Sequence, residues 1–112
     1  MIPPRRLPGA QPTKEAMTIR LVVTFTAAPG KGAELAKFYK ARCAECREEP
    51  GCEQFECFQS VDDPDKVILL ERWKDQAALD THARINSARP GPAPGLRVGT
   101  GEREDYEYNR TR

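Results

Sequence analysis

The sequence predicts an α+β fold in which a four-stranded antiparallel sheet carries two helices on one of its faces. Apolar residues alternate with polar ones in strand-like runs, and two further segments space their apolar residues at a helical period. Clusters of Pro, Gly and Asp separate these segments. In chain order the segments follow the pattern β-α-β-β-α-β, which is the ferredoxin-like arrangement. We therefore expect a ferredoxin-like sandwich over residues 17–109.

The first strand and the first helix are expected at residues 18–27 and 32–48. On the strand, one set of alternating apolar side chains shares a face: Ile19, Leu21, Val23 and Phe25. On the helix, apolar side chains form one stripe: Leu35, Tyr39, Cys43 and Cys46. Phe38 flanks this stripe. Arg42 falls within the same arc, where it either packs its stem and extends its guanidinium to water or lines a pocket.

The second and third strands are expected to form a hairpin over residues 53–60 and 67–73. The turn between them contains Asp62-Asp63-Pro64-Asp65, and both residue types favour a reversal of the chain. The run Val67-Ile68-Leu69-Leu70 is apolar without alternation, which is typical of a strand covered on both faces. Trp73, the only tryptophan, ends this strand.

The second helix is expected at residues 75–88, because Asp75 can act as its N-cap. Its apolar residues recur near one face: Ala78, Leu79, His82 and Ile85. Residues 88–101 are rich in Pro and Gly and predict a long loop, which is either a mobile lid over a cavity or a disordered connector. The last strand is expected at residues 102–109, followed by a short tail.

Length and charge limit the classes of protein. A chain of 112 residues is one domain by length, and a domain of this size often gains stability from a partner. Lys and Arg number 18 against 17 Asp and Glu, without a basic stripe, so neither nucleic acid nor an anionic membrane is expected as a partner. No apolar run approaches the roughly 20 residues that cross a bilayer.

Residues 1–16 differ in composition from the rest of the chain. They contain four Pro and show no periodicity, which predicts a disordered tail; alternatively, translation begins at Met17. This segment has basic residues but no apolar core of a secretory signal, so we expect a cytoplasmic protein.

The four cysteines raise the question of a metal site or a disulfide. Cys52 and Cys57 flank or occupy the second strand. Five positions apart on a strand, their side chains are expected to point to opposite faces, which disfavours a shared ion with Cys43 and Cys46. Without an export signal, free thiols are the expected state. We therefore expect no metal site, and a redox role for Cys43 and Cys46 is the alternative.

The sheet face away from the helices is also expected to be partly apolar. Its apolar side chains come from three strands: Val22, Phe58, Ile68 and Leu70. A sheet that is apolar on both faces needs a partner, and the simplest partner is a second copy packed sheet to sheet. The sequence therefore predicts a homodimer that buries this face.

Several motifs together are fairly specific. Pro-Gly follows the first helix, a Ser-x-Asp-Asp-Pro turn joins the hairpin, Glu-Arg-Trp ends the third strand, and the second helix contains His82. With the segment VVTFTAAPGKGAEL and the closing YEY strand, these motifs resemble the antibiotic biosynthesis monooxygenase family of the dimeric α+β barrel group. The resemblance covers residues 18–88 well and the last strand loosely, and it implies a dimeric α+β barrel.

The family includes quinol monooxygenases, polyketide-tailoring oxygenases and haem-degrading enzymes. The haem-degrading branch has an Asn on the first strand and a Trp on the second helix, where this chain has Val23 and His82, and the chain has no second His. We therefore do not expect haem degradation. The remaining branch implies a cofactor-independent monooxygenase that uses dioxygen on a quinol or on a phenolic or polyketide-type aromatic.

Resemblance to that branch implies a pocket between sheet and helices. His82 is the expected base, because its ordinary pKa is near neutrality, and Trp73 offers an aromatic wall and an indole donor. Tyr39 and Arg42 are expected to contact a phenolate or an oxygen anion. If Glu71 points inward it needs a partner, for which Arg42 is the candidate. Two aromatic residues are expected to line the apolar part: Phe25 and Phe38.

A simpler explanation accompanies these roles. Core packing alone also accounts for His82, Trp73 and Tyr39. The alternative to an enzyme is therefore a non-catalytic small-molecule-binding or stress-response protein on the same scaffold.

Overall fold

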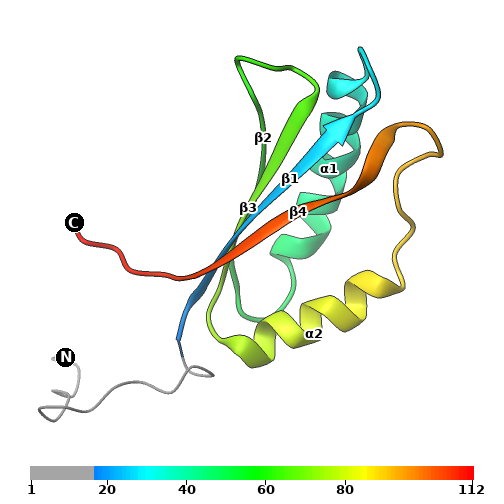
Figure 1. Cartoon of the computed structure of the whole chain (residues 1–112). Helices are drawn as coiled ribbons and strands as arrows, with labels where there is room; N and C mark the ends of the chain where they lie inside the picture. Colours follow the sequence, from blue (N-terminus) through cyan, green and yellow to red (C-terminus); the bar gives the residue numbers. More distant parts are fainter. Residues whose placement is uncertain (1–16) are drawn as a thin grey trace, which may run out of the picture.

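The computed structural model describes residues 17–112, which form one sheet and two helices (Figure 1). Residues 1–16, for which we predicted a disordered tail, lie outside the described residues. The elements are, in chain order, β1 (Ile19–Ala27), α1 (Gly32–Arg47), β2 (Cys52–Gln59), β3 (Lys66–Trp73), α2 (Gln76–Ser87) and β4 (Arg97–Glu107). No helix within residues 17–112 has the length and apolar composition needed to cross a membrane.

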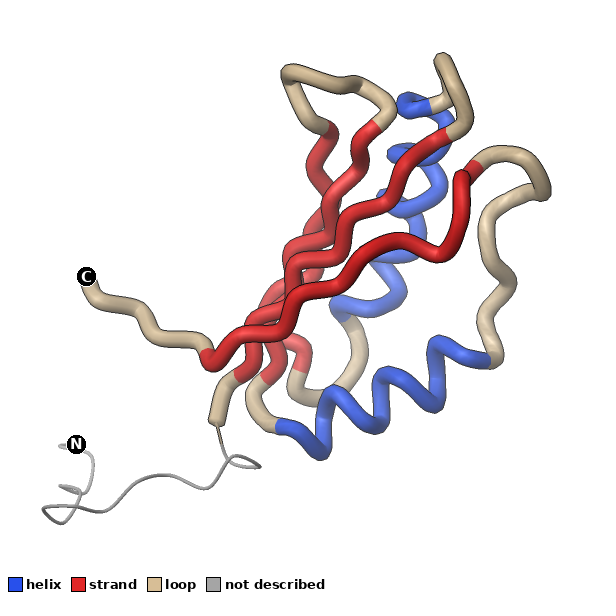
Figure 2. The backbone as a smooth tube through the Cα atoms, viewed as in Figure 1, coloured by secondary structure: helices blue, strands red, loops and turns tan. Residues whose placement is uncertain are grey.

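The four strands are antiparallel and lie in the spatial order β2-β3-β1-β4. Both helices lie on the same side of this sheet (Figures 1 and 2). Helix α1 packs chiefly against β2, whereas α2 contacts the sheet chiefly at β3. The predicted ferredoxin-like α+β fold is confirmed.

The core fills the space between the sheet and the helices. The predicted stripe of α1 is buried as expected: Leu35, Tyr39, Cys43 and Cys46. On α2 the prediction holds for Ala78, Leu79 and His82 but is wrong for Ile85, which is 38% exposed. The reason is that the buried residues of α2 end at His82, so the C-terminal residues 83–87 are only partly covered by the rest of the protein.

The last strand is longer than predicted. It begins at Arg97 rather than Glu102, so the loop after α2 is shorter than residues 88–101. Gly99 and Gly101 both have positive φ, and the register with β1 shifts between Thr24 and Thr26. Such a bulge uses glycines that are otherwise typical of loops, which explains why the sequence pattern concealed the start of this strand.

A second irregularity corrects the prediction for the cysteines of β2. Cys57 lies opposite Leu69 and Cys52 lies opposite Trp73, and both cysteines pack against the core. The expected opposite orientation is wrong because the register with β3 shifts between Cys52 and Gln54. This bulge inserts a residue and restores the inward direction of Cys52.

The β2–β3 turn is tied to the start of α1. The two carboxylate oxygens of Asp65 accept hydrogen bonds from the backbone N–H groups of Gly30 and Gly32, each at 3.0 Å. A Cβ atom at Gly32 would lie 1.8 Å from the carbonyl oxygen of Pro64. The close approach of turn and helix therefore requires glycine at position 32.

Candidate functional site

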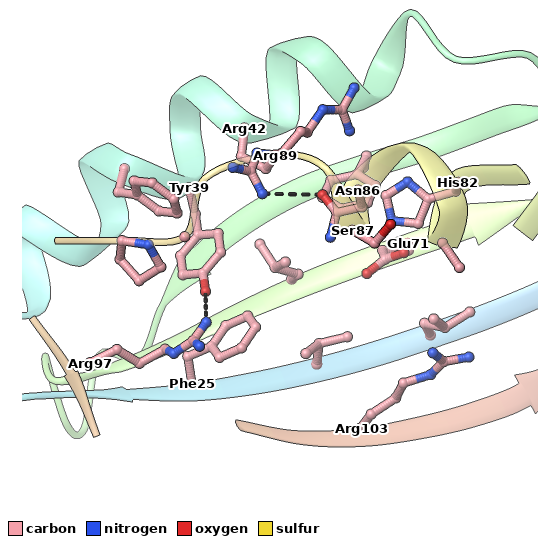
Figure 3. A pocket seen from close by; sticks show the side chains of 18 of the residues that line it. Phe25, Tyr39, Arg42, Glu71, His82, Asn86, Ser87, Arg89, Arg97 and Arg103 are labelled. Carbon is pink, nitrogen blue, oxygen red and sulfur yellow. Dashed lines mark hydrogen bonds between the residues drawn. The ribbon is translucent and has the colours of Figure 1, made fainter. Parts of the chain in front are cut away.

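A cavity of about 410 Å³ lies between the inner face of the sheet, both helices and the loop after α2 (Figure 3). This volume is typical of small-molecule sites, which occupy roughly 300–1,000 Å³. Strands β1 and β3 contribute an apolar floor: Leu21, Val23, Phe25 and Leu69. Charged and polar side chains line much of the remainder: Arg42, Glu71, His82, Asn86, Arg97 and Arg103.

His82 lines the cavity from α2 and is fixed on two sides. Its Nδ1 lies 2.9 Å from Oε1 of Glu49, a residue that follows the C-terminus of α1. Its ring packs against Trp73, with 4.6 Å between ring centroids. A neutral imidazole donates to a carboxylate through Nδ1–H, which leaves Nε2 as the hydrogen-bond acceptor of the ring.

Glu49 is in turn held by Arg89. Nη1 of Arg89 donates to Oε2 of Glu49 at 2.6 Å, and its Nε lies 3.2 Å from Oε2 of Glu45. Glu49 and His82 are both buried. The chain Arg89–Glu49–His82 therefore orients the imidazole in the way that a buried carboxylate orients a catalytic histidine.

Burial is the main influence on the acid–base state of His82. It lowers the pKa of His82 below its ordinary value of 6.5, because the charged ring loses hydration. The hydrogen bond and charge of Glu49 oppose this effect, whereas the charges of Arg89 and Arg103 add to it. The ring is therefore neutral at pH 7 and able to accept a proton.

Glu71 is a second proton-holding group in the cavity. Strand β3 directs it inward, where it is 4% exposed, and its Oε1 accepts a hydrogen bond from Nε1 of Trp73 at 2.9 Å. Burial raises the pKa of Glu71 to about 7, against the weaker opposing effects of Trp73 and Arg103. The expected pairing with Arg42 is wrong, because Arg42 extends toward α2 and donates to Asn86 instead.

Three aromatic rings build the other end of the cavity. Phe25 stacks on Tyr39 with 4.6 Å between centroids, and Phe38 meets Tyr39 edge-on at 5.0 Å. Arg97 donates from Nη1 to the Tyr39 hydroxyl at 2.7 Å (Figure 3). Burial raises the pKa of Tyr39, and Arg97 and Arg42 only partly offset this, so the phenol keeps its proton at pH 7.

The loop after α2 lies along the cavity. Gly91 and Pro92 line it, and the Pro90 carbonyl accepts a hydrogen bond from Arg42. Farther along, the Leu96 carbonyl accepts from the backbone N–H of Ala28 at 2.9 Å. The loop is therefore attached to the body at both ends and forms part of the cavity wall.

Comparison with known proteins bears on this site. A family model described as antibiotic biosynthesis monooxygenase matches residues 18–87. The chain belongs to the antibiotic biosynthesis monooxygenase family. No curated protein shows significant similarity to it.

Several solved structures share the fold of this protein. PA3566 from Pseudomonas aeruginosa is 26% identical, with a TM-score of 0.71 over 86% of this chain and 98% of that protein. SO0527 from Shewanella oneidensis is 28% identical, with a TM-score of 0.69 over 81% of this chain and 90% of that protein. A conserved protein from Methanosarcina mazei Go1 is 24% identical, with a TM-score of 0.66 over 86% and 97% of the two chains.

The structure brings together most residues that the sequence singled out for a family site. Five of them line the cavity: Phe25, Phe38, Tyr39, Arg42 and His82. Trp73 does not; it is fully buried behind His82 and Glu71, where it packs on one and donates to the other. Glu49, Arg89 and Arg97 were missed, because each acts through a partner distant in sequence and no local motif marks it.

The four cysteines of this protein are free thiols. Burial raises the pKa of Cys43 and of Cys46 to about 12, so both remain protonated at pH 7, which disfavours the redox alternative. Donor atoms of Cys46, Glu49 and His82 do lie within 4.8 Å of one another. However, Arg89 donates to both Glu49 and Cys46, so a cationic group already contacts two of these three residues.

Proposed function

We propose that this protein is a cofactor-independent monooxygenase that uses dioxygen to oxidise a quinol or a phenolic or polyketide-type aromatic. The observation that supports it most is the Arg89–Glu49–His82 chain, which orients a neutral imidazole in a cavity with an apolar and aromatic lining. The family match supports the oxygenase class. The volume of the cavity suits a substrate of one or a few rings.

The proposed reaction begins with proton transfer. Nε2 of His82 takes a hydroxyl proton, and the resulting anion passes an electron to dioxygen. The radical and superoxide combine through a new C–O bond, the resulting peroxide anion takes the proton back from His82, and the hydroperoxide then loses water. The substrate thus loses two hydrogen atoms and gains one oxygen atom, while the second oxygen atom of dioxygen leaves as water. Glu71, with a pKa of about 7, is a second proton acceptor at the same end of the cavity.

The test is oxygen uptake with a panel of hydroquinones. Substitution His82→Gln removes the base, and loss of a general base typically lowers turnover by about 100-fold or more. Asp80→Asn on the exposed side of the same helix is the matched control and should keep full activity. Turnover by His82→Gln at the wild-type rate would contradict the mechanism. Ligand-induced thermal stabilisation with no oxygen uptake would instead support the non-catalytic alternative.

We also propose that the protein acts as a homodimer through the outer sheet face. Val22 pairs with Leu70, and Ile68 pairs with Phe58, which places four apolar side chains on the face opposite the helices. Phe58 is 47% exposed, and the other three are partly exposed. A contiguous apolar patch of this kind favours burial against a second copy. Light scattering should give twice the chain mass, and a monomer at micromolar concentration would refute this proposal.

A further inference from the structure

Two arginines at the aromatic end of the cavity have no carboxylate partner among residues 17–112. Arg42 and Arg97 take part in none of the salt bridges in this part of the chain, whereas the other two arginines of the cavity do: Arg89 and Arg103. Arg89 pairs with Glu45 and Glu49, and Arg103 pairs with Asp105. The cavity therefore contains two cationic groups that its own carboxylates do not neutralise.

Neutral groups and aromatic rings hold these two guanidiniums in place. Arg42 donates to the amide oxygen of Asn86 at 3.1 Å and lies 5.3 Å from the ring centroid of Phe38. Arg97 donates to the hydroxyl of Tyr39 and lies 5.0 Å from the ring centroid of Phe25. Cation–π contacts of this kind fix a guanidinium and leave its charge available to an anion.

Arg42 also has an unused donor. Its Nε is buried and has no hydrogen-bond partner among the described residues. A buried N–H of a charged group without a partner is costly, because the lost hydration is not replaced. An anionic ligand beside Arg42 would supply a counter-charge where the protein supplies none.

The cavity is therefore polarised along its length. Arg42, Arg97 and Tyr39 lie toward one end, and His82 and Glu71 lie together at the other (Figure 3). We infer that its ligand is a hydroxylated aromatic carboxylic acid, with the carboxylate at the end that Arg42 and Arg97 make positive, the ring over the apolar floor and a hydroxyl directed to His82. This inference names the substrate class and rests on the proposed function only for the reaction at the hydroxyl.

The test compares two probes that differ by one carboxylate, 2,5-dihydroxybenzoate and 1,4-dihydroxybenzene. Binding is measured by calorimetry under argon, so that no oxidation occurs. We expect the acid to bind at least about tenfold more tightly, which corresponds to about 1.4 kcal/mol, because its carboxylate accepts charge-assisted hydrogen bonds that the neutral probe cannot form. The methyl ester of the acid, which has nearly the same shape without the charge, should bind like the neutral probe.

Variants locate the carboxylate. Arg42→Gln and Arg97→Gln should each remove most of the preference for the acid, whereas Arg84→Gln, on the exposed side of α2, should leave it unchanged. The methyl-ester comparison uses the wild-type protein, so it decides the question even if a variant fails to fold. Equal affinity for acid and ester, no measurable binding of the acid, or a preference retained in both folded cavity variants would overturn the inference.

Oxygen uptake separates this inference from the proposed function. Uptake with 1,4-dihydroxybenzene and no preference for the acid would refute the inference and leave the oxygenase intact. Tight binding of the acid without uptake on either probe would support the inference and refute the oxygenase.

Discussion

The buried carboxyl group of Glu71 makes protein stability depend on pH in a predictable direction. Its pKa is about 7 in the folded protein, against an ordinary value of 4.5. Between these two pH values the folded protein retains a proton that the unfolded chain releases. The free energy of unfolding therefore falls as the pH rises through this window, and the contribution of the neutral carboxyl is lost above pH 7. Because one pKa unit corresponds to about 1.4 kcal/mol, the full effect is about 3 kcal/mol.

The substitution Glu71→Gln isolates this effect. Glutamine has the shape of the protonated carboxyl and keeps an oxygen that can accept from Nε1 of Trp73. Urea unfolding followed by fluorescence of Trp73, the only tryptophan, gives the stability of both proteins. The two should be similarly stable at pH 4.5, and the variant should be more stable by about 3 kcal/mol at about pH 8.

The control places the same change on the surface. Glu102→Gln on the exposed side of β4 should alter stability by less than about 0.5 kcal/mol at either pH. His82 also titrates, but it is present in wild type and variant, so its contribution cancels in the difference. Parallel stability curves for wild type and Glu71→Gln from pH 4.5 to about pH 8 would refute the reasoning.

Two further predictions test the contacts that support the site. Glu49→Gln should destabilise the protein by about 3 kcal/mol, since it leaves Arg89 without its buried partner. The same substitution should also lower the pKa of His82 further, because it removes the charge of Glu49. An NMR titration of this single histidine measures the pKa, and an unchanged value would argue against the contact. Gly32→Ala should cost about 3 kcal/mol or more in thermal or urea unfolding, because the new Cβ meets the Pro64 carbonyl. Gly91→Ala, which meets nothing within 4 Å, should be close to neutral, and equal losses in both variants would contradict the packing described for the turn.

The strong local signals of the sequence were sufficient for the architecture. Each of these signals acts over a few residues: the alternation on β1, the Asp- and Pro-rich turn, and the N-cap at Asp75. In the structure the side chain of Asp75 accepts a hydrogen bond from the backbone N–H of Ala78 at 2.8 Å. The start of β4 was missed because Gly99 and Gly101 serve a bulge, which has the composition of a loop.

The sequence identified only part of the candidate site. His82 stood out as the single histidine and Trp73 as the single tryptophan. Their partners did not, because Glu49 lies 33 positions before His82, and Arg97 lies 58 positions after Tyr39. Chain folding, rather than spacing along the chain, sets such contacts. Sequence patterns therefore identified the candidate base and missed the residues that orient and polarise its surroundings.

The most direct test of the proposed function is the fate of the oxygen atoms. When 1,4-dihydroxybenzene is incubated with the protein under ¹⁸O₂, a monooxygenase inserts one labelled oxygen atom into the organic product and releases the other as labelled water. We predict this product for the wild-type protein and its loss in His82→Gln. An unlabelled quinone formed together with labelled hydrogen peroxide would contradict oxygen transfer and the function that we propose.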